Sequence, residues 1–181
     1  MTSGERTKIE IERTFLLSAL PEDFDSYDSW EMEQGYLLTK GCTLRIRRAG
    51  DTCFLTLKRK DPEVVPGIAI VNEEFETEIP EASYEALKQL VRGGFIQKTR
   101  TRIPYLEHVI EVDVFHGALE GLVFAEIEYE DQEDVLKLPL PTWFSKDVSK
   151  DKRFRNTALL CMEPEEIEDF LKEIGEIALV L

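Results

Sequence analysis

The segment from Lys8 to Phe15 alternates charged or polar residues with apolar ones. Such alternation over eight residues is typical of a β-strand with two unlike faces. Glu10 and Glu12 therefore point to the same face, about 7 Å apart along the strand. Two carboxylates so placed repel each other unless a cation lies between them, and hard divalent ions such as Mg²⁺ take carboxylate oxygens. Taken alone, the pair is explained more simply as a solvated strand face, since most charged side chains are exposed, so the later strands have to decide.

The same alternation recurs along the chain, and the charges are sorted by segment. Acidic faces are predicted at Glu10 and Glu12, at Glu74, Glu76 and Glu78, at Glu111 and Asp113, and at Glu126, Glu128 and Glu130. Basic faces are predicted at Arg45 and Arg47, at Lys58 and Lys60, and at Lys98, Arg100 and Arg102. An open sheet with one solvated face also alternates, but its polar residue types are usually mixed. The sorting therefore favours a closed antiparallel barrel, with charged faces lining a lumen and helices covering the apolar outer faces.

Helices and loops are predicted between these strands. A helix is expected over Glu81–Val91, a short one over Asp131–Leu136, and a C-terminal one that starts at Pro164, a favoured first-turn residue. The acidic, turn-rich stretch 21–30 predicts a loop before a strand over 34–39, and the two prolines in 61–67 predict another loop. No repeat or linker interrupts the chain, so we expect a single α+β domain over residues 1–181.

Composition limits the partners. The chain has 37 acidic and 22 basic residues, a net charge of −15, so nucleic acid and anionic membranes are not expected partners. The three widely spaced cysteines, Cys42, Cys53 and Cys161, indicate a reducing compartment without a disulfide framework. The N-terminus lacks the apolar region of a signal peptide. We therefore expect a cytoplasmic protein, and the sequence leaves its oligomeric state open, a homodimer included.

The expected lumen suggests its own ligand. Roughly seven cations facing one lumen would gather a polyanion, while carboxylates could hold metal ions that bridge to it. That combination fits a triphosphate chain better than an organic substrate. The cysteines have no metal-ligand spacing, His108 and His116 have no partner motif, and no Gly-rich phosphate loop is present.

The ordered motifs resemble those of the CYTH family, the triphosphate tunnel metalloenzymes. They are Glu10-Ile11-Glu12-Arg13, Leu44-Arg45-Ile46-Arg47, Leu55-Thr56-Leu57-Lys58, Glu74-Phe75-Glu76, Lys98-Thr99-Arg100, Glu111-Val112-Asp113-Val114-Phe115 and Ala125-Glu126-Ile127-Glu128. The segments 143–149 and 152–156 resemble the tail of the bacterial branch. The resemblance covers about residues 8–160, and it implies an eight-stranded antiparallel tunnel that uses Mg²⁺ or Mn²⁺ on linear triphosphates.

The resemblance also implies roles for single residues. Glu10, Glu12, Glu126 and Glu128 would be metal ligands, with Asp113 and Glu111 close to the ion. Arg45, Arg47, Lys58, Lys98 and Arg100 would bind phosphate oxygens, and Glu74 and Glu76 would orient those cations or a second metal. Glu10, Glu12, Lys58 and Lys98 are the expected catalytic set.

One position departs from the family pattern. The first motif of the family is Glu-x-Glu-x-Lys, and Thr14 stands at its third position here. The resemblance therefore implies a substrate site that lacks one cation, and we expect lower turnover unless Lys8 or Arg102 supplies the charge.

The reaction implied by the resemblance is metal-assisted attack of water on phosphorus, with tripolyphosphate cleaved to pyrophosphate and phosphate. Two alternatives stay open at this point. One is cyclisation of ATP to cyclic AMP, in which a ribose hydroxyl attacks in place of water. The other is a non-catalytic module that binds polyphosphate, which the missing lysine at Thr14 keeps under consideration.

Overall fold

The computed structural model describes residues 8–37, 42–60 and 70–181, and antiparallel strands dominate it. Within these residues the strands are β1 (Lys8–Leu17), β2 (Ser29–Leu37), β3 (Thr43–Ala49), β4 (Thr52–Lys60), β5 (Ile70–Ile79), β6 (Ile96–Tyr105), β7 (His108–Phe115), β8 (Val123–Tyr129) and β9 (Phe144–Asp147). The α-helices are α1 (Glu81–Lys88), α2 (Gln132–Lys137), α3 (Asn156–Leu159) and α4 (Pro164–Gly175). None of the described helices is both long and apolar enough to cross a membrane.

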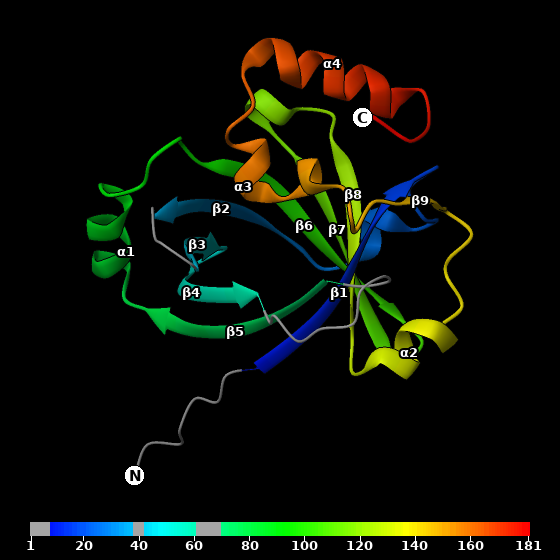
Figure 1. Cartoon of the computed structure of the whole chain (residues 1–181), viewed down its shortest axis with the longest axis horizontal. Helices are drawn as coiled ribbons and strands as arrows, with labels where there is room; N and C mark the ends of the chain where they lie inside the picture. The colour runs from blue at the N-terminus through cyan, green and yellow to red at the C-terminus, as the bar shows by residue number, and fades with distance from the viewer. Residues whose placement is uncertain (1–7, 38–41, 61–69) are drawn as a thin grey trace.

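Eight of these strands form a closed ring. Their order is β5-β4-β3-β2-β6-β7-β8-β1, and β1 pairs back with β5 (Figure 1). β1 closes the ring because it pairs with β5 through residues 8–12 and with β8 through residues 11–16. β9 pairs only with the end of β1, at residues 15–17, and lies outside the ring. The predicted eight-stranded antiparallel barrel is therefore confirmed.

The outward apolar faces of the strands pack under helices, which explains the alternation in the sequence. Tyr84 of α1 packs against Ile46 of β3 and Cys53 of β4. On another side of the barrel, Ile11 of β1 belongs to a buried cluster that includes Val135 of α2. Full burial of one large aliphatic side chain contributes about 1.5–3 kcal/mol. Figure 1 shows α1 and α2 on opposite sides of the strands.

An apolar cluster closes one end of the lumen. Side chains two positions apart in a strand share a face, so Leu16, Phe115 and Phe124 point inward like Thr14, Asp113 and Glu126. They pack with Phe154 and with the apolar stripe of α4, which includes Phe170. Figure 1 shows α3 and α4 together along one side of the barrel. The charged part of the lumen therefore lies between this cluster and the other end of the barrel.

The elements differ from the prediction at a few places. β2 begins at Ser29, inside the predicted loop 21–30, because residues 29–34 pair in register with residues 96–101 of β6. The acidic run before it hid the alternation at Trp30 and Met32. β9 and α3 were not predicted, since four-residue elements are too short to show a period. The predicted loop 61–67 lies outside the described residues.

Candidate active site in the barrel lumen

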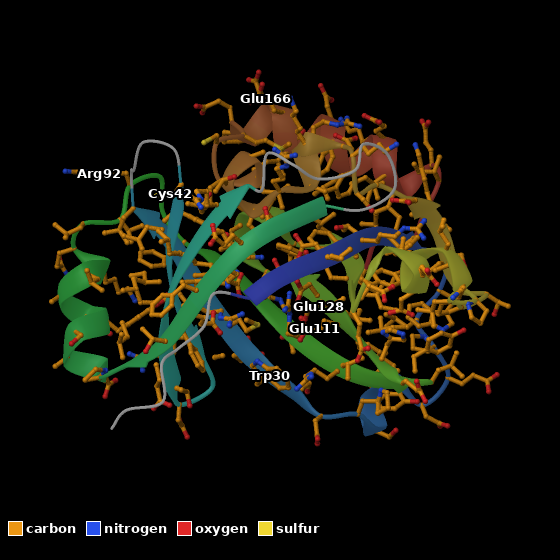
Figure 2. The ribbon with its side chains drawn as sticks, turned by 60° about the horizontal axis from the view of Figure 1, so that its bottom comes forward. Trp30, Cys42, Arg92, Glu111, Glu128 and Glu166 are labelled. Carbon is orange, nitrogen blue, oxygen red and sulfur yellow. The ribbon has the colours of Figure 1, made fainter. Side chains whose placement is uncertain are left out.

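The lumen holds a cavity of about 910 Å³. All eight ring strands contribute to its wall, together with residues 148–157, which we call the tail segment. The predicted site residues on the wall are Glu10, Glu12, Arg45, Arg47, Lys58, Glu74, Arg100, Glu111, Glu126 and Glu128. Figure 2 shows Glu111 and Glu128 within the ring of strands, whereas Glu166 lies on the outer helix α4. The remaining predicted residues, Glu76, Lys98 and Asp113, do not line the cavity. Glu76 and Asp113 contact arginines that do, and Lys98 contacts Asp113.

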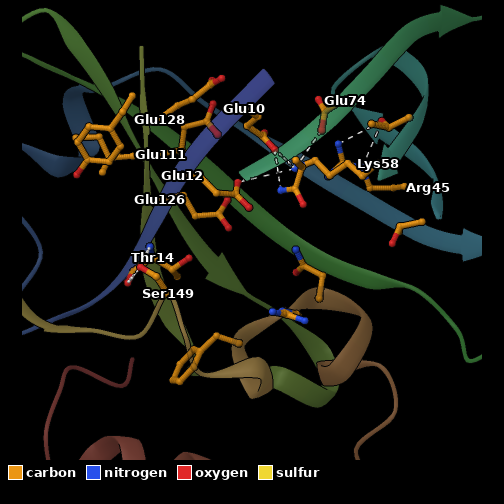
Figure 3. A pocket seen from close by; sticks show the side chains of 18 of the residues that line it. Glu10, Glu12, Thr14, Arg45, Lys58, Glu74, Glu111, Glu126, Glu128 and Ser149 are labelled. Carbon is orange, nitrogen blue, oxygen red and sulfur yellow. Dashed lines mark hydrogen bonds and ion pairs between the residues drawn. The ribbon is translucent and has the colours of Figure 1, made fainter. Parts of the chain in front are cut away.

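Lys58 on β4 lies in the middle of an acidic group (Figure 3). Its ammonium nitrogen is 2.5 Å from Glu10, 3.0 Å from Glu74 and 3.8 Å from Glu12. The amide of Asn72 also donates a hydrogen bond to Glu10, at 3.5 Å. Three carboxylates therefore share one lysine at this place.

Burial, together with repulsion among the carboxylates, raises the pKa values of acidic groups here. Burial is the main reason that the pKa of Glu12 is raised to about 8; Lys58 lowers it, and Glu10 and Glu126 add to the increase. Burial likewise raises the pKa of Glu10. Although burial opposes it, the carboxylates of Glu12, Glu10 and Glu74 raise the pKa of Lys58, which keeps its charge at neutral pH. A further cation near Glu12 would relieve the repulsion.

Arg45 and Arg47 of β3 share a single carboxylate. A terminal nitrogen of Arg45 lies 3.3 Å from Glu76, and one of Arg47 lies 2.8 Å from it. The hydroxyl of Thr56 donates to the same carboxylate at 2.6 Å. The Nε atom of Arg47 is buried and has no hydrogen-bond partner among the described residues. Two positive charges against one negative charge leave this side of the lumen able to bind an anion.

Arg100 of β6 is the most heavily paired cation of the site. It makes a two-pronged contact with Asp113, with two nitrogens at 2.7 Å, and it contacts Glu126 at 2.8 Å and Glu111. Lys98 also pairs with Asp113, and both side chains are almost completely buried. Despite burial, Arg100 and Lys98 lower the pKa of Asp113, so it is ionised. Asp113 therefore fixes Arg100 from behind the cavity wall.

Carboxylates from two neighbouring strands gather on one side of the lumen. β1 and β8 are paired so that Glu12 lies opposite Glu128 and Thr14 lies opposite Glu126. Figure 3 shows Glu10, Glu12, Glu126 and Glu128 on this side. No three or more His, Cys, Asp or Glu side chains of the described residues are already arranged as a metal-ion site. The oxygen donors and the surplus negative charge around Glu12 nevertheless fit a hard divalent ion.

Some residues of the cavity wall were not predicted from the sequence. Tyr36 of β2 accepts a hydrogen bond from the amide of Gln34 at 2.8 Å. In the tail segment, the hydroxyl of Ser149 accepts a hydrogen bond from the backbone N–H of Thr14 at 2.9 Å, and Arg155 lines the same cavity. The alternation of charge that marked the other strands is missing at these positions. Only the resemblance of the tail segment to a family pattern drew attention to it.

The chain resembles proteins of known activity over most of its length. It is 31% identical over 159 residues to an inorganic triphosphatase of Nitrosomonas europaea, which covers 86% of this chain and 99% of that protein. It is 34% identical over 156 residues to an inorganic triphosphatase of Acetivibrio thermocellus, which covers 83% of this chain and 92% of that protein. No protein-family model matches the chain.

Solved structures agree with this relationship. A crystal structure of an inorganic triphosphatase matches with a TM-score of 0.62 and 30% identity, over 88% of this chain and 99% of that one. A putative adenylyl cyclase from Hippeastrum, described as having a dominant triphosphatase activity, shares the fold at 19% identity and a TM-score of 0.50, over 92% of this chain and 88% of that one. The charged tunnel and the two relatives above 30% identity together show that this chain belongs to the CYTH-like family of triphosphate tunnel proteins, among the bacterial inorganic triphosphatases.

Proposed function

We propose that this protein hydrolyses inorganic tripolyphosphate to pyrophosphate and phosphate, with Mg²⁺ or Mn²⁺ as the cofactor. One observation carries the proposal: the lumen wall is divided by charge. In the ring order, β3 is four strands away from β8 in either direction, so Arg45 and Arg47 are opposite Glu126 and Glu128 across the cavity. A chain of phosphates held by the arginines would extend toward the carboxylates.

The arginines and Lys58 would bind the phosphate oxygens. In the absence of ligand each contacts a carboxylate, so substrate binding exchanges one set of charge-assisted contacts for another. The buried Nε–H of Arg47 has no partner among the described residues, so it is a donor available to a phosphate oxygen. These preorganised donors would stabilise the charge that develops on the phosphoryl oxygens during transfer.

The carboxylates of Glu10, Glu12, Glu126 and Glu128 would hold the divalent ion. When bound, such an ion lowers the pKa of a water molecule and offsets charge on a phosphoryl oxygen. Lys58 would orient Glu10 and Glu12, because its ammonium contacts both. This role follows from contacts that already exist between the side chains.

Lys98 and Asp113 take supporting roles in this proposal. The sequence suggested a phosphate contact for Lys98 and a position near the ion for Asp113. Their burial and their pairing with each other support a different role, in which Lys98 holds Asp113 and Asp113 holds Arg100. We therefore assign both to positioning Arg100 rather than to direct contact with substrate or metal.

A phosphate-release assay tests the proposal. The purified protein is incubated with tripolyphosphate, ATP or thiamine triphosphate, each with Mg²⁺, with Mn²⁺ and with EDTA. We expect the highest kcat/KM with tripolyphosphate and no release in EDTA. Formation of cyclic AMP from ATP without phosphate release would favour a cyclase, and binding of tripolyphosphate without turnover would favour a non-catalytic module.

Two neighbouring residues of β4 provide a matched control. Lys58 points into the cavity, whereas Arg59 is exposed and pairs with Glu73 outside the cavity. Lys58→Gln should lower kcat/KM for tripolyphosphate by at least about tenfold, as expected for loss of a charge-assisted contact. Arg59→Gln should leave it within about twofold, since an exposed ion pair contributes little. Equal effects of the two substitutions would contradict the assignment of the lumen as the active site.

A further inference from the structure

The strand cations of the cavity are all paired with carboxylates, and one cation from outside the strands is not. The arginines and lysines on the wall, within the part of the chain that the structure describes, are Arg45, Arg47, Lys58, Arg100, Arg102 and Arg155. The first five each form an ion pair with a glutamate within 4 Å. The side chain of Arg155 has no ion pair or hydrogen bond with any described residue. It is therefore the wall cation that needs no exchange of partners to bind an anion.

Arg155 is held in place by the core on both sides of it. Its neighbour Phe154 is buried in the apolar cluster that closes the lumen, and so is Leu159 at the end of α3. The backbone oxygen of Arg155 accepts hydrogen bonds from Ala158 and Leu159 at 2.8 and 2.9 Å. The half-buried Arg155 side chain is thus presented to the cavity by a fixed backbone.

The same segment is tied to β1 at Thr14. The backbone N–H of Val148 donates to the carbonyl of Thr14 at 2.9 Å. The hydroxyl of Ser149 accepts from the backbone N–H of Thr14 at 2.9 Å (Figure 3). The beginning of the tail segment, which also carries Arg155, is therefore hydrogen-bonded to Thr14. At this position the first motif of the family has a lysine.

Another arginine of the tail segment is neutralised by the protein. Arg153 does not line the cavity, and it pairs with Asp151 and with Glu173 of α4. Arg155 lines the cavity without such a pair among the described residues, so its charge is available to an anion.

We infer that Arg155 binds a phosphate oxygen of the triphosphate, and that it supplies from the tail segment the cation that β1 lacks at Thr14. This inference rests on the proposed function, because it concerns the substrate of the same cavity. With Arg155 in this role, the substrate site needs no lysine at position 14. We therefore expect the turnover of the wild-type protein not to be lowered by Thr14.

The test combines Arg155 with Thr14. Arg155→Gln should lower kcat/KM for tripolyphosphate by about 10- to 150-fold, the range for one charge-assisted contact. Arg155→Lys should keep most of the activity, since the charge remains. Thr14→Lys should change the wild type by less than about threefold, yet raise kcat/KM of Arg155→Gln by about tenfold or more. Such rescue is expected of a missing charge and not of a damaged fold.

Lys152→Gln is the matched control. Lys152 is an exposed cation of the same segment that does not line the cavity, so its loss should leave kcat/KM within about twofold. An Arg155→Gln variant as active as the wild type would overturn the inference. So would a Thr14→Lys substitution that raises activity equally in both backgrounds, because the two positions would then act independently.

Calorimetric titration with tripolyphosphate in EDTA separates this inference from the proposed function. Weaker binding by Arg155→Gln than by Arg155→Lys or Lys152→Gln supports the inference even if no variant hydrolyses the substrate. Should Thr14→Lys fail to fold, which a melting curve would reveal, the comparison of Gln and Lys at position 155 still decides. Hydrolysis by the wild type together with equal binding by all variants would leave the proposed function standing and remove Arg155 from it.

Discussion

The ammonium group of Lys58 on β4 lies 2.5 Å from a carboxylate oxygen of Glu10 on β1. β5 lies between these strands in the ring, so the contact spans the inner face of a third strand. The positive charge of Lys58 thus neutralises part of the negative charge of Glu10, Glu12 and Glu74. A divalent ion held by these carboxylates would compete with Lys58 for them and would leave its ammonium group able to contact a phosphate oxygen, so ion and substrate should each favour binding of the other.

Removing one carboxylate charge on β8 should stop the metal-dependent reaction without unfolding the protein. In Glu126→Gln the amide can still accept the hydrogen bond from Arg100, but it loses the charge that would attract the ion. We expect kcat to fall by at least about 100-fold, with an unchanged circular dichroism spectrum. Glu78→Gln, an exposed position of β5 outside the cavity, is the control. Near-normal turnover of Glu126→Gln would refute its assignment as a metal ligand.

The spread of cations over β3, β4 and β6 predicts selection by chain length. Because pyrophosphate is one phosphate shorter, we expect it to contact fewer of Arg45, Lys58 and Arg100 than tripolyphosphate does. Loss of one charge-assisted contact costs about 1.5–3 kcal/mol, so pyrophosphate should bind at least about tenfold more weakly. The inhibition constants of pyrophosphate and of a non-hydrolysed triphosphate analogue against tripolyphosphate hydrolysis measure this difference in affinity. Equal inhibition constants would mean that the lumen responds to charge and not to length.

The two acids on β7 that contact Arg100 should differ in their effect on stability. Asp113 is completely buried, and Asp113→Asn leaves Lys98 and Arg100 without their shared charge, at a cost of about 3–5 kcal/mol. Glu111 is 31% exposed, so Glu111→Gln should cost less than about 1 kcal/mol. Urea unfolding of both variants provides the comparison. A smaller loss of unfolding free energy for Asp113→Asn than for Glu111→Gln would contradict a stabilising role of the buried Asp113.

The raised pKa of Glu12 predicts how the metal-free protein responds to pH. Its carboxyl changes from an ordinary value of 4.5 to about 8 in the folded state, so between these values the folded protein binds more protons than the unfolded chain. Stability in EDTA should therefore fall as the pH rises from about 5 to 8. Melting temperatures across this range test it, and Glu12→Gln should flatten the curve. A wild-type melting temperature that rises over the same range would contradict the raised pKa of Glu12.

The barrel and most of its wall could be predicted because the alternation of a strand is visible in its own sequence. The common face of Glu10 and Glu12, or of Arg45 and Arg47, follows from their spacing alone. Contacts between distant segments leave no such local pattern. The burial of Lys98 with Asp113 depends on the apolar cluster at one end of the lumen, and Arg155 reaches the cavity only because a non-periodic tail packs against β1. The cytoplasmic location and the single domain stay predictions.

Phosphorus NMR of the products tests the central claim most directly. Tripolyphosphate is incubated with the wild-type protein and Mg²⁺, and parallel samples contain EDTA or the Lys58→Gln variant. We expect equal amounts of pyrophosphate and orthophosphate in the wild-type sample with Mg²⁺, at least about tenfold slower accumulation with Lys58→Gln, and no products in EDTA. Intact tripolyphosphate in all three samples, or equal cleavage in all three, would contradict it.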